Sequence, residues 1–114
     1  MALRTERIGE VAVVIPEGML KGDRETTELE NILRKLMQDG QKKILLDLAK
    51  TAWLNSIAIG MLTGVHTSAT NRGVKFSVCN VERRIHDTLV ILRLINVLNV
   101  YDKREEALEA LAKG

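Results

Sequence analysis

The sequence has little of what disulfide frameworks, metal sites and nucleic-acid surfaces require. Its 114 residues include one cysteine, two histidines and one proline. A single cysteine forms no disulfide within the chain, and Cys79, His66 and His86 are too few for a structural zinc site. Aromatic residues make up 3% and the net charge is only +2, which disfavours base stacking and a basic nucleic-acid surface. We therefore expect no metal and no nucleic-acid partner.

Long hydrophobic runs are absent as well. No apolar stretch approaches the roughly 20 residues that cross a bilayer, and the opening MALRTERIGE has no apolar core of signal-peptide length. We expect a cytoplasmic protein with no membrane partner. Cys79 lies in an apolar run, which predicts a buried thiol that acts as a small hydrophobe.

The remaining composition is typical of one globular domain. Apolar residues make up 46% and charged residues 28%, a balance that argues against disorder. The length fits one domain with its own core. Pro16 is the only proline, so no proline-rich linker divides residues 1–114.

Apolar patterns predict alternating strands and helices. Runs of β-branched and apolar residues predict strands over residues 11–15, 43–48, 74–79 and 97–101, and residues 4–8 are expected as a weaker partner strand of the first. Apolar residues at helical spacing predict helices over residues 27–39, 56–72, 82–94 and 103–112. Thr27 and Glu30 have capping-box spacing at the start of the first helix. This order predicts an α/β domain with about four helices and a mixed sheet of four or five strands, whose first pair is antiparallel.

The junction after the strand at 43–48 is where chemistry is expected, because open α/β sheets place their sites at strand ends that lead into helices. Asn55 and Ser56 lie at the mouth of the following helix. Either side chain can cap the helix. The alternative is that Ser56 is phosphorylated, since a helix amino terminus accommodates the added negative charge.

Other candidate sites are weaker. Asp47, near the end of an apolar run, either accepts backbone N–H bonds where the strand ends or contacts a partner. Ser56, Asp47 and a histidine could make a hydrolase triad only on paper, because G-x-S-x-G is absent. No phosphate-binding glycine loop occurs. We therefore expect no cofactor and no enzymatic activity, with an unrecognised catalytic site as the remaining alternative.

An ordered set of segments resembles the STAS domain family, which includes bacterial anti-sigma-factor antagonists and sulphate-transporter tails. The segments are KILLDL, AKTAWLNSIAIG, RGVKFSVCNV, ERRIHDTLVILRL, VLNVYD and KREEALEAL. The resemblance covers about residues 5–112. It implies that residues 1–114 form a single STAS-like domain, in agreement with the element order above.

The resemblance places a phosphorylation switch at Ser56. The family pattern is Asp-Ser followed by a small residue, Gly, an apolar residue and Gly, and its serine is phosphorylated by a partner that is both anti-sigma factor and serine kinase. Here Asn55 replaces the acid, Ile57 and Ala58 replace the small residue and the first glycine, and Gly60 matches the last. These departures leave a helix cap in place and narrow the approach to Ser56.

A family feature in the loop at 17–24 is also matched. Antagonists carry Gly-x-Leu here, often with a nearby aspartate that helps to contact the kinase. Gly18-Met19-Leu20 fits, and Asp23 is either the counterpart of that aspartate or a solvated or capping residue. The partner-binding residues that the resemblance implies are Gly18, Leu20, Asp23, Asn55, Ile57, Ile59, Gly60 and Thr63.

The implied function is that of an anti-sigma-factor antagonist, a phosphoprotein in partner switching and transcription regulation. It would bind an anti-sigma factor that is also a serine kinase, and a PP2C-type phosphatase would reset it. The alternative is a phosphate-independent STAS scaffold or sensor module that self-associates or binds other signalling proteins. The resemblance leaves a weak homodimer open.

Overall fold

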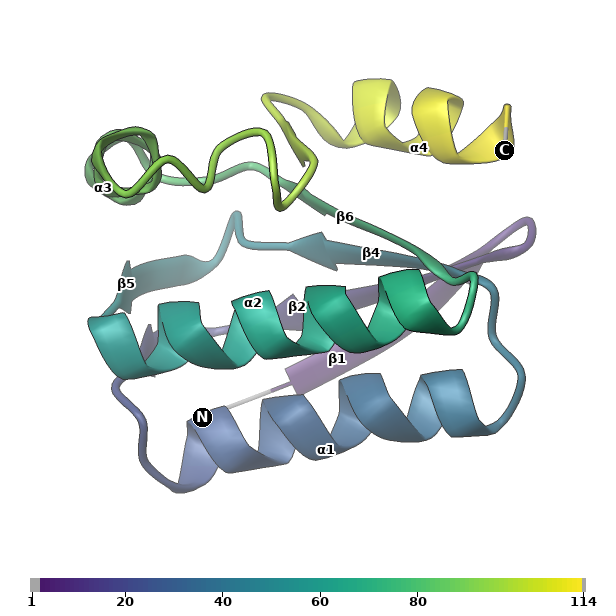
Figure 1. Cartoon of the computed structure of the whole chain (residues 1–114), viewed down its shortest axis with the longest axis horizontal. Coiled ribbons are helices and arrows are strands. Elements are labelled where there is room, and N and C mark those ends of the chain that lie inside the picture. Colours follow the sequence, from purple (N-terminus) through teal and green to yellow (C-terminus); the bar gives the residue numbers. More distant parts are fainter. Residues whose placement is uncertain (1–2, 114) are drawn as a thin grey trace.

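A mixed sheet of five strands, in the order β1-β2-β4-β6-β7, forms the centre of the computed structural model, which describes residues 3–113 (Figure 1). Its strands are β1 (Leu3–Ile8), β2 (Val11–Pro16), β4 (Lys43–Asp47), β6 (Lys75–Cys79) and β7 (Val100–Tyr101). β1 runs antiparallel to β2, and the other neighbours are parallel. The predicted α/β fold with a mixed sheet is confirmed.

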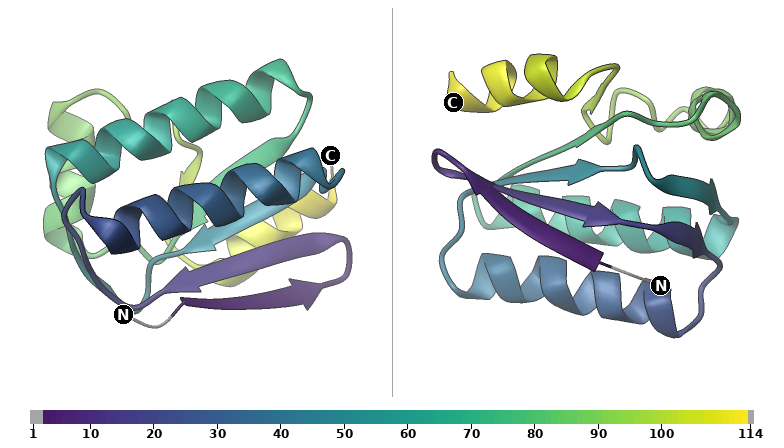
Figure 2. Two further views of the ribbon diagram at one scale, coloured as in Figure 1. Left: turned by 90° about the horizontal axis from the view of Figure 1, so that it is seen from below. Right: turned by 180° about the vertical axis from the view of Figure 1, so that it is seen from behind.

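Helices cover both faces of this sheet. Two helices, α1 (Arg24–Gln38) and α2 (Ser56–Asn71), lie side by side on one face, and α4 (Arg104–Ala112) lies on the other (Figure 2). The helix α3 (Arg83–Ile91) follows the carboxyl end of β6. None of the helices in residues 3–113 combines the length and apolar character needed to span a membrane.

Side chains alternate between the two faces of the sheet along each strand, so the core consists of two apolar clusters. Residues such as Ile44, Leu46 and Phe76 point toward α1 and α2 and belong to the larger apolar cluster. Their neighbours point to the opposite face, where α4 covers them with Ala107 and Leu111. β2 is buried along its whole length, because both of its faces are covered. This burial explains its unbroken apolar sequence.

Two short strands lie in segments expected to be connections. β3 (Gly18–Leu20) and β5 (Thr51–Leu54) pair in parallel as a separate two-stranded sheet. Each is too short to show a local period, and each depends on a partner about thirty residues away. This pairing holds the 18–24 loop beside the start of α2.

The first helix begins before the predicted capping box. α1 starts at Arg24, so Thr27 lies inside its first turn and donates to the Asp23 carbonyl oxygen at 3.3 Å. Thr26 accepts a hydrogen bond from the Gly22 amide at 2.9 Å. The predicted capping box of Thr27 and Glu30 is therefore wrong.

The third helix and the last strand are shorter than predicted. α3 ends at Ile91 because Arg93 adopts φ of 59°, and β7 begins only at Val100 because Asn99 adopts φ of 52°. Both values lie in the left-handed region, which neither a helix nor a strand accommodates. As a result Leu92, which a helix over residues 82–94 would place on one apolar stripe with Ile85 and Leu89, is 50% exposed.

The Asp47 carboxylate joins four parts of the fold. One oxygen accepts hydrogen bonds from the Ala49 amide and the Asn80 side chain, both at 3.0 Å. The other accepts from Arg104 Nε at 2.9 Å and lies 2.8 Å from Nη2. Arg104 Nη1 also reaches Glu6 of β1 at 3.2 Å. The predicted backbone-accepting role of Asp47 is confirmed, and Arg104 is a partner that the sequence did not reveal.

These contacts set the charge states of the cluster. Burial by itself raises the pKa of Asp47, but the hydrogen bonds from Asn80, Ala49 and Arg104 outweigh it, so the pKa lies below its ordinary value. Burial, together with the negative charge of Asp47, raises the pKa of the Cys79 thiol to about 12. The thiol is therefore neutral at physiological pH, as the sequence predicted.

We expect Arg104→Leu to lower the free energy of unfolding by about 3 kcal/mol at neutral pH, because a buried carboxylate then lacks its cation. In the native protein the Asp47 pKa is depressed, so its stabilisation is present above the unfolded pKa of about 4 and is lost as the pH falls through the folded pKa. In the variant the hydrogen bond and the charge of Arg104 are lost, so the Asp47 pKa is higher than in the native protein. The deficit therefore shrinks toward acid, which urea unfolding across this range measures.

Arg84→Leu is the matched control. Arg84 is exposed, and its Nε lies 3.8 Å from Glu82, so we expect a loss below about 0.5 kcal/mol. A deficit of Arg104→Leu that is equal at neutral and acid pH would contradict the assigned role of the Asp47 charge.

Candidate functional site

Asn55 fixes the start of α2. Its Oδ1 accepts a hydrogen bond from the Ala58 amide at 3.0 Å, and its Nδ2 donates to the Lys21 carbonyl oxygen at 2.7 Å. Its own amide donates to the Leu20 carbonyl oxygen at 3.1 Å. Of the two residues that could cap the helix, Asn55 is therefore the cap, and it also fastens the helix to the 18–24 loop.

Ser56 is left free by this arrangement. Its side chain is exposed, and its hydroxyl makes no hydrogen bond to any group in residues 3–113. The side-chain and backbone oxygens of Asn55 accept hydrogen bonds from the amides of Ala58 and Ile59. The earlier amides of the helix have no intrahelical partner. The first turn carries no acidic residue. An added phosphate would therefore meet free N–H donors and the positive end of the helix dipole.

Ile57 packs on the 18–24 loop. Gly22 has φ of 83°, and a Cβ added there would lie 2.6 Å from Ile57 Cγ2. Only glycine fits this close approach. Ile57 is nevertheless 62% exposed, so it also forms part of the surface beside Ser56.

Two further apolar residues lie at this end of the molecule. Met19 of β3 and Trp53 of β5 are paired in register and are 48% and 40% exposed. Sequence reasoning missed both because it assigned their segments to connections, although a tryptophan in an expected loop was a usable signal. We call Met19, Trp53, Asn55, Ser56 and Ile57 the switch surface.

The loop residues that the sequence predicted to bind a partner differ in their burial. Gly18 is exposed, has φ of 95° and donates to the Lys50 carbonyl oxygen at 3.0 Å. Leu20 is fully buried in the core. Asp23 is exposed and precedes α1, but its carboxylate caps no amide and has no ion pair within residues 3–113. Asp23 is therefore a solvated carboxylate beside the switch surface.

The residues of α2 that were predicted to bind a partner also differ in their burial. Ile59 is buried in the core, while Gly60 is exposed and nothing lies within 4 Å of where its Cβ would be. Thr63 is half-buried and donates to the Ile59 carbonyl oxygen at 3.0 Å. Ile59 therefore lies beneath the surface, whereas Gly60 leaves the backbone of the helix accessible at the surface.

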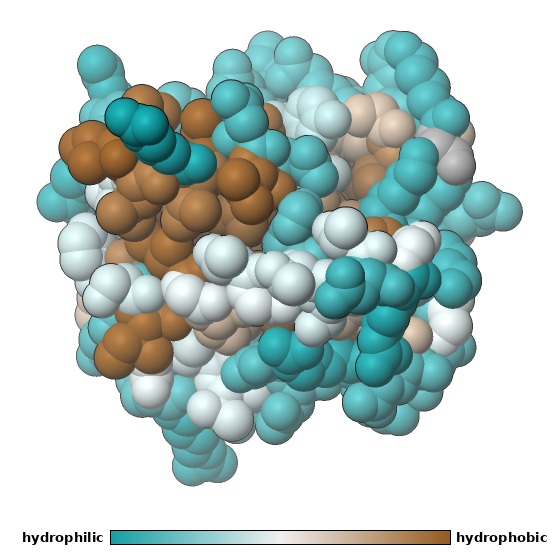
Figure 3. Space-filling view, viewed as in Figure 1, coloured by the Kyte–Doolittle hydropathy of each residue, from teal (hydrophilic) through white to brown (hydrophobic). Residues whose placement is uncertain are grey.

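The exposed face of α2 carries no net charge. None of its residues, Ser56–Asn71, is Asp, Glu, Lys or Arg. In the space-filling view, a pale band of intermediate hydropathy follows this helix (Figure 3). A molecule that docks beside Ser56 would meet small and neutral side chains of α2 there.

The hydrolase triad considered from the sequence does not assemble. Ser56 and His66 lie ten residues apart on α2, which is about 15 Å along the helix axis. Asp47 is engaged by Arg104 at the end of β4. Within residues 3–113 no three of the His, Cys, Asp and Glu side chains are placed to hold a metal ion.

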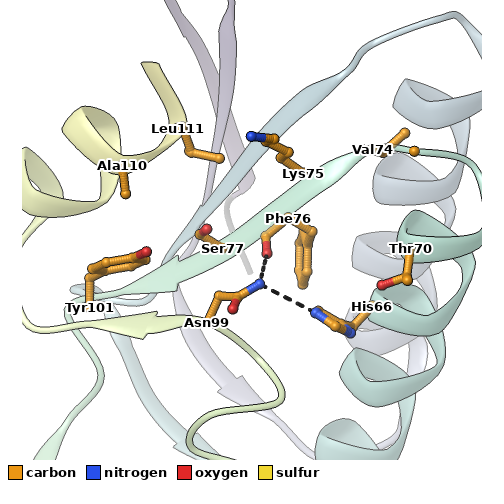
Figure 4. Close-up of a pocket in the computed structure, with 11 residues that line it drawn as sticks. His66, Thr70, Val74, Lys75, Phe76, Ser77, Asn99, Tyr101, Ala110 and Leu111 are labelled. Carbon is orange, nitrogen blue, oxygen red and sulfur yellow. Dashed lines mark hydrogen bonds between the residues drawn. The ribbon is translucent and has the colours of Figure 1, made fainter. Parts of the chain in front are cut away.

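A cavity of about 450 Å³ lies between the carboxyl-terminal parts of α2 and α4 (Figure 4). His66 and Asn99 line it, and Asn99 Nδ2 lies 3.4 Å from His66 Nε2 and donates to the Phe76 carbonyl oxygen at 3.2 Å. Burial lowers the pKa of His66, which favours the neutral ring. No sequence-predicted partner-binding residue lines this cavity.

Comparison with known proteins identifies similar chains. A sequence model of the STAS domain matches residues 2–107. A Thermotoga neapolitana protein, named by homology to TM1081 as an anti-sigma factor antagonist, is 24% identical over 102 residues, which cover 90% of each protein. The match therefore spans nearly all of both sequences.

Solved structures share the fold. TM1081 from Thermotoga maritima aligns with a TM-score of 0.88 at 18% identity, over 96% of this chain and 94% of that chain. The anti-sigma factor antagonist SpoIIAA in its unphosphorylated form aligns with a TM-score of 0.76 at 14% identity, over 99% of each chain. At these identities the likeness establishes the fold.

We expect Asn55→Ala to lower the free energy of unfolding by about 1 kcal/mol, because the helix loses its cap and its link to Lys21. Ser56→Ala is the neighbouring control and should change it by less than about 0.5 kcal/mol, since its hydroxyl has no partner. Chemical denaturation measures both. A larger loss for Ser56→Ala than for Asn55→Ala would reverse the assignment of the cap.

We expect Gly22→Ala to destabilise the protein through both backbone strain and the clash with Ile57. Gly9 has φ of 60° with nothing within 4 Å of its Cβ position, so Gly9→Ala isolates the strain, about 1–2 kcal/mol. Combining Gly22→Ala with Ile57→Ala should cost less than the sum of the single changes, with a coupling of about 1 kcal/mol. Additive losses would show that the loop and helix do not interact here.

Proposed function

The chain belongs to the STAS domain family and is similar to anti-sigma factor antagonists in sequence and structure, and we propose that it is an antagonist switched by phosphorylation at Ser56. Its partner is an anti-sigma factor that is also a serine kinase. Binding that partner frees a sigma factor and so regulates transcription.

The observation that carries this proposal is the free hydroxyl of Ser56 at the start of a capped helix. Because Asn55 caps α2, the Ser56 side chain makes no structural contact that a phosphate would disturb. The free amides and the helix dipole stabilise the added charge. SpoIIAA, a relative of the same fold, was solved in its unphosphorylated form, which fits a switch of this kind.

The docking surface of this proposal combines the switch surface with its neighbours on the loop and on α2. Gly18, Asp23, Gly60 and Thr63 would lie at its edges. Leu20 and Ile59 are buried, so they would contribute by holding the loop and the helix from beneath. The hydrogen bonds of Asn55 to the loop keep the two halves of this surface together before a partner binds.

Phosphorylation then changes the surface and not the fold. A phosphate adds about −1.5 to −2 charges at physiological pH. A partner that covers Ser56 would have to bury this charge against the neutral face of α2. An unpaired buried charge costs several kcal/mol, which is a large part of the roughly 8 kcal/mol that holds a micromolar complex.

In this scheme the chain is a substrate and not an enzyme. The partner kinase transfers the phosphoryl group from ATP to Ser56, and a PP2C-type phosphatase removes it. The cycle takes place in the cytoplasm, where the kinase, the sigma factor and ATP are found.

Ile57 supports a second candidate, a phosphate-independent STAS scaffold or sensor module. Its side chain stands next to Ser56, packs on Gly22 and is 62% exposed, so it narrows the approach of a kinase. In this case Ser56 is an ordinary surface residue that is not phosphorylated, and the module self-associates or binds other signalling proteins without phosphate.

We expect Ser56→Glu to weaken binding of the anti-sigma factor from the same organism by at least about tenfold, because the carboxylate brings a charge into the interface. Ser56→Ala should bind like the native protein but accept no phosphate from the kinase and ATP. Isothermal titration calorimetry measures binding, and intact mass measurement with site mapping measures phosphorylation.

Thr67→Glu is the matched control, because Thr67 is exposed on α2 eleven residues further along and should leave binding unchanged. Equal binding by the Glu and Ala variants at Ser56 would contradict the proposed phosphorylation switch. If the native protein also stays unmodified at Ser56 in growing and stressed cells, the phosphate-independent module is favoured.

A further inference from the structure

The cavity of about 450 Å³ between α2 and α4 follows from the shortness of β7 (Figure 4). This strand pairs only with Val78 and Cys79, at the carboxyl end of β6. The edge of β6 is therefore uncovered from Lys75 to Ser77, and the cavity lies along it. Its volume falls within the range of about 300–1,000 Å³ that small-molecule sites occupy.

Ser77 places a hydroxyl without a partner in this cavity. The residue is only 5% exposed, and its hydroxyl makes no hydrogen bond to any group in residues 3–113. Every side-chain nitrogen or oxygen that is sealed from solvent in this part of the chain has a partner, so the Ser77 oxygen reaches open space. A polar group at this depth normally has a hydrogen-bond partner. The Ser77 hydroxyl faces the cavity instead and is available to a ligand.

Further polar groups line the same cavity without partners. The hydroxyls of Thr70 and Tyr101 and the side-chain oxygen of Asn99 make no hydrogen bond within residues 3–113. The side-chain nitrogen of Asn99 donates to the Phe76 carbonyl oxygen and lies 3.4 Å from His66 Nε2, so the direction of its oxygen is fixed. The cavity therefore offers several hydroxyl and carbonyl groups in set positions, which suits a ligand with several hydroxyl groups of its own.

The charge of the cavity comes from one lysine. Lys75 has no ion pair within residues 3–113, and none of the described residues that line the cavity is acidic. His66 adds no charge at neutral pH, because burial lowers its pKa. Figure 4 shows Lys75, Ser77 and Tyr101 extending their polar ends on the side of β6 that faces α4. A single cation in a cavity wall without acids attracts a single negative group.

We propose that this cavity binds a small organic acid that carries one carboxylate and several hydroxyl groups, the chemistry of a sugar acid. The carboxylate pairs with Lys75. The hydroxyl groups bind the side chains of Ser77, Asn99 and Tyr101, and Leu111 of α4 covers the carbon chain. A simple inorganic anion would leave these polar groups unmatched, and a neutral polyol would leave the cation unmatched. The cavity shares no residue with the switch surface, so this inference does not rest on phosphorylation of Ser56.

Titration of the full chain with D-gluconate, followed by amide nitrogen–proton NMR spectra at constant ionic strength, tests the site. Saturable shifts are expected at the amides of Phe76, Ser77 and Asn99, with a dissociation constant of roughly 1 mM for a ligand of this size. Sorbitol has the hydroxyl groups without the carboxylate, and acetate has the carboxylate without the hydroxyl groups. Each should bind at least about tenfold more weakly than gluconate.

Substitutions at the cavity, with a matched control, test the assigned residues. Lys75→Gln should weaken gluconate binding by about tenfold, because the cation is lost. Lys42→Gln removes an exposed lysine whose carbonyl oxygen accepts the Lys75 amide but whose side chain lies outside the cavity, and it should leave binding unchanged. Ser77→Ala should weaken binding by about fivefold. Its thermal midpoint should not fall, because the hydroxyl has no partner within the protein.

Gluconate that causes no saturable shifts well above millimolar concentration would overturn the proposal. Sorbitol or acetate binding as tightly as gluconate would also overturn it, because the cavity would then not recognise a hydroxylated acid. Equal losses for Lys42→Gln and Lys75→Gln would show general attraction between charges and no site. Ser56→Glu should bind gluconate like the native chain, so failure of the switch and failure of this site are told apart.

Discussion

The fold depends on a buried carboxylate that is fully satisfied. Asp47 stands at the carboxyl end of the central strand β4, where it accepts from a loop amide, from Asn80 and from Arg104. The last of these contacts ties α4 to the sheet. α4 covers the second apolar cluster, which would otherwise face water. A single polar site thus fixes the helix that closes one face of the sheet, and Arg104 extends the link to β1 through Glu6.

On the other side of the sheet, a comparable link joins α2 to the 18–24 loop. Asn55 caps α2 and binds the 18–24 loop, while Ile57 packs on Gly22. These contacts make one rigid surface from segments about thirty residues apart. Since Ser56 takes no part in them, a phosphate there can alter what the surface binds without loosening the structure that presents it. In the proposed switch, the neutral face of α2 beside Ser56 offers no cation to pair with the added charge.

The candidate site could be predicted in part, because its residue types carry local chemistry. An Asn-Ser pair at a strand-to-helix junction indicates a cap and a modifiable serine, and the STAS resemblance added the loop at Gly18 and Asp23. The burial of Leu20 and Ile59 could not be deduced, since it depends on which elements cover them. Met19 and Trp53 were missed for the same reason: their strands exist only as a pair formed across the chain.

The sequence by itself determined the order of the four helices and of the five strands of the main sheet, the mixed sheet and the place of Ser56, because hydrophobic period and turn chemistry are local properties of the chain. Only the tertiary structure decided which residue caps α2, which cation neutralises Asp47 and where α3 stops. Each of these depends on a contact between distant residues or on a backbone angle, such as that of Arg93, set by the packing around it. The apolar residues after Leu89 look like core in the sequence, and the turn at Arg93 places them on the surface instead.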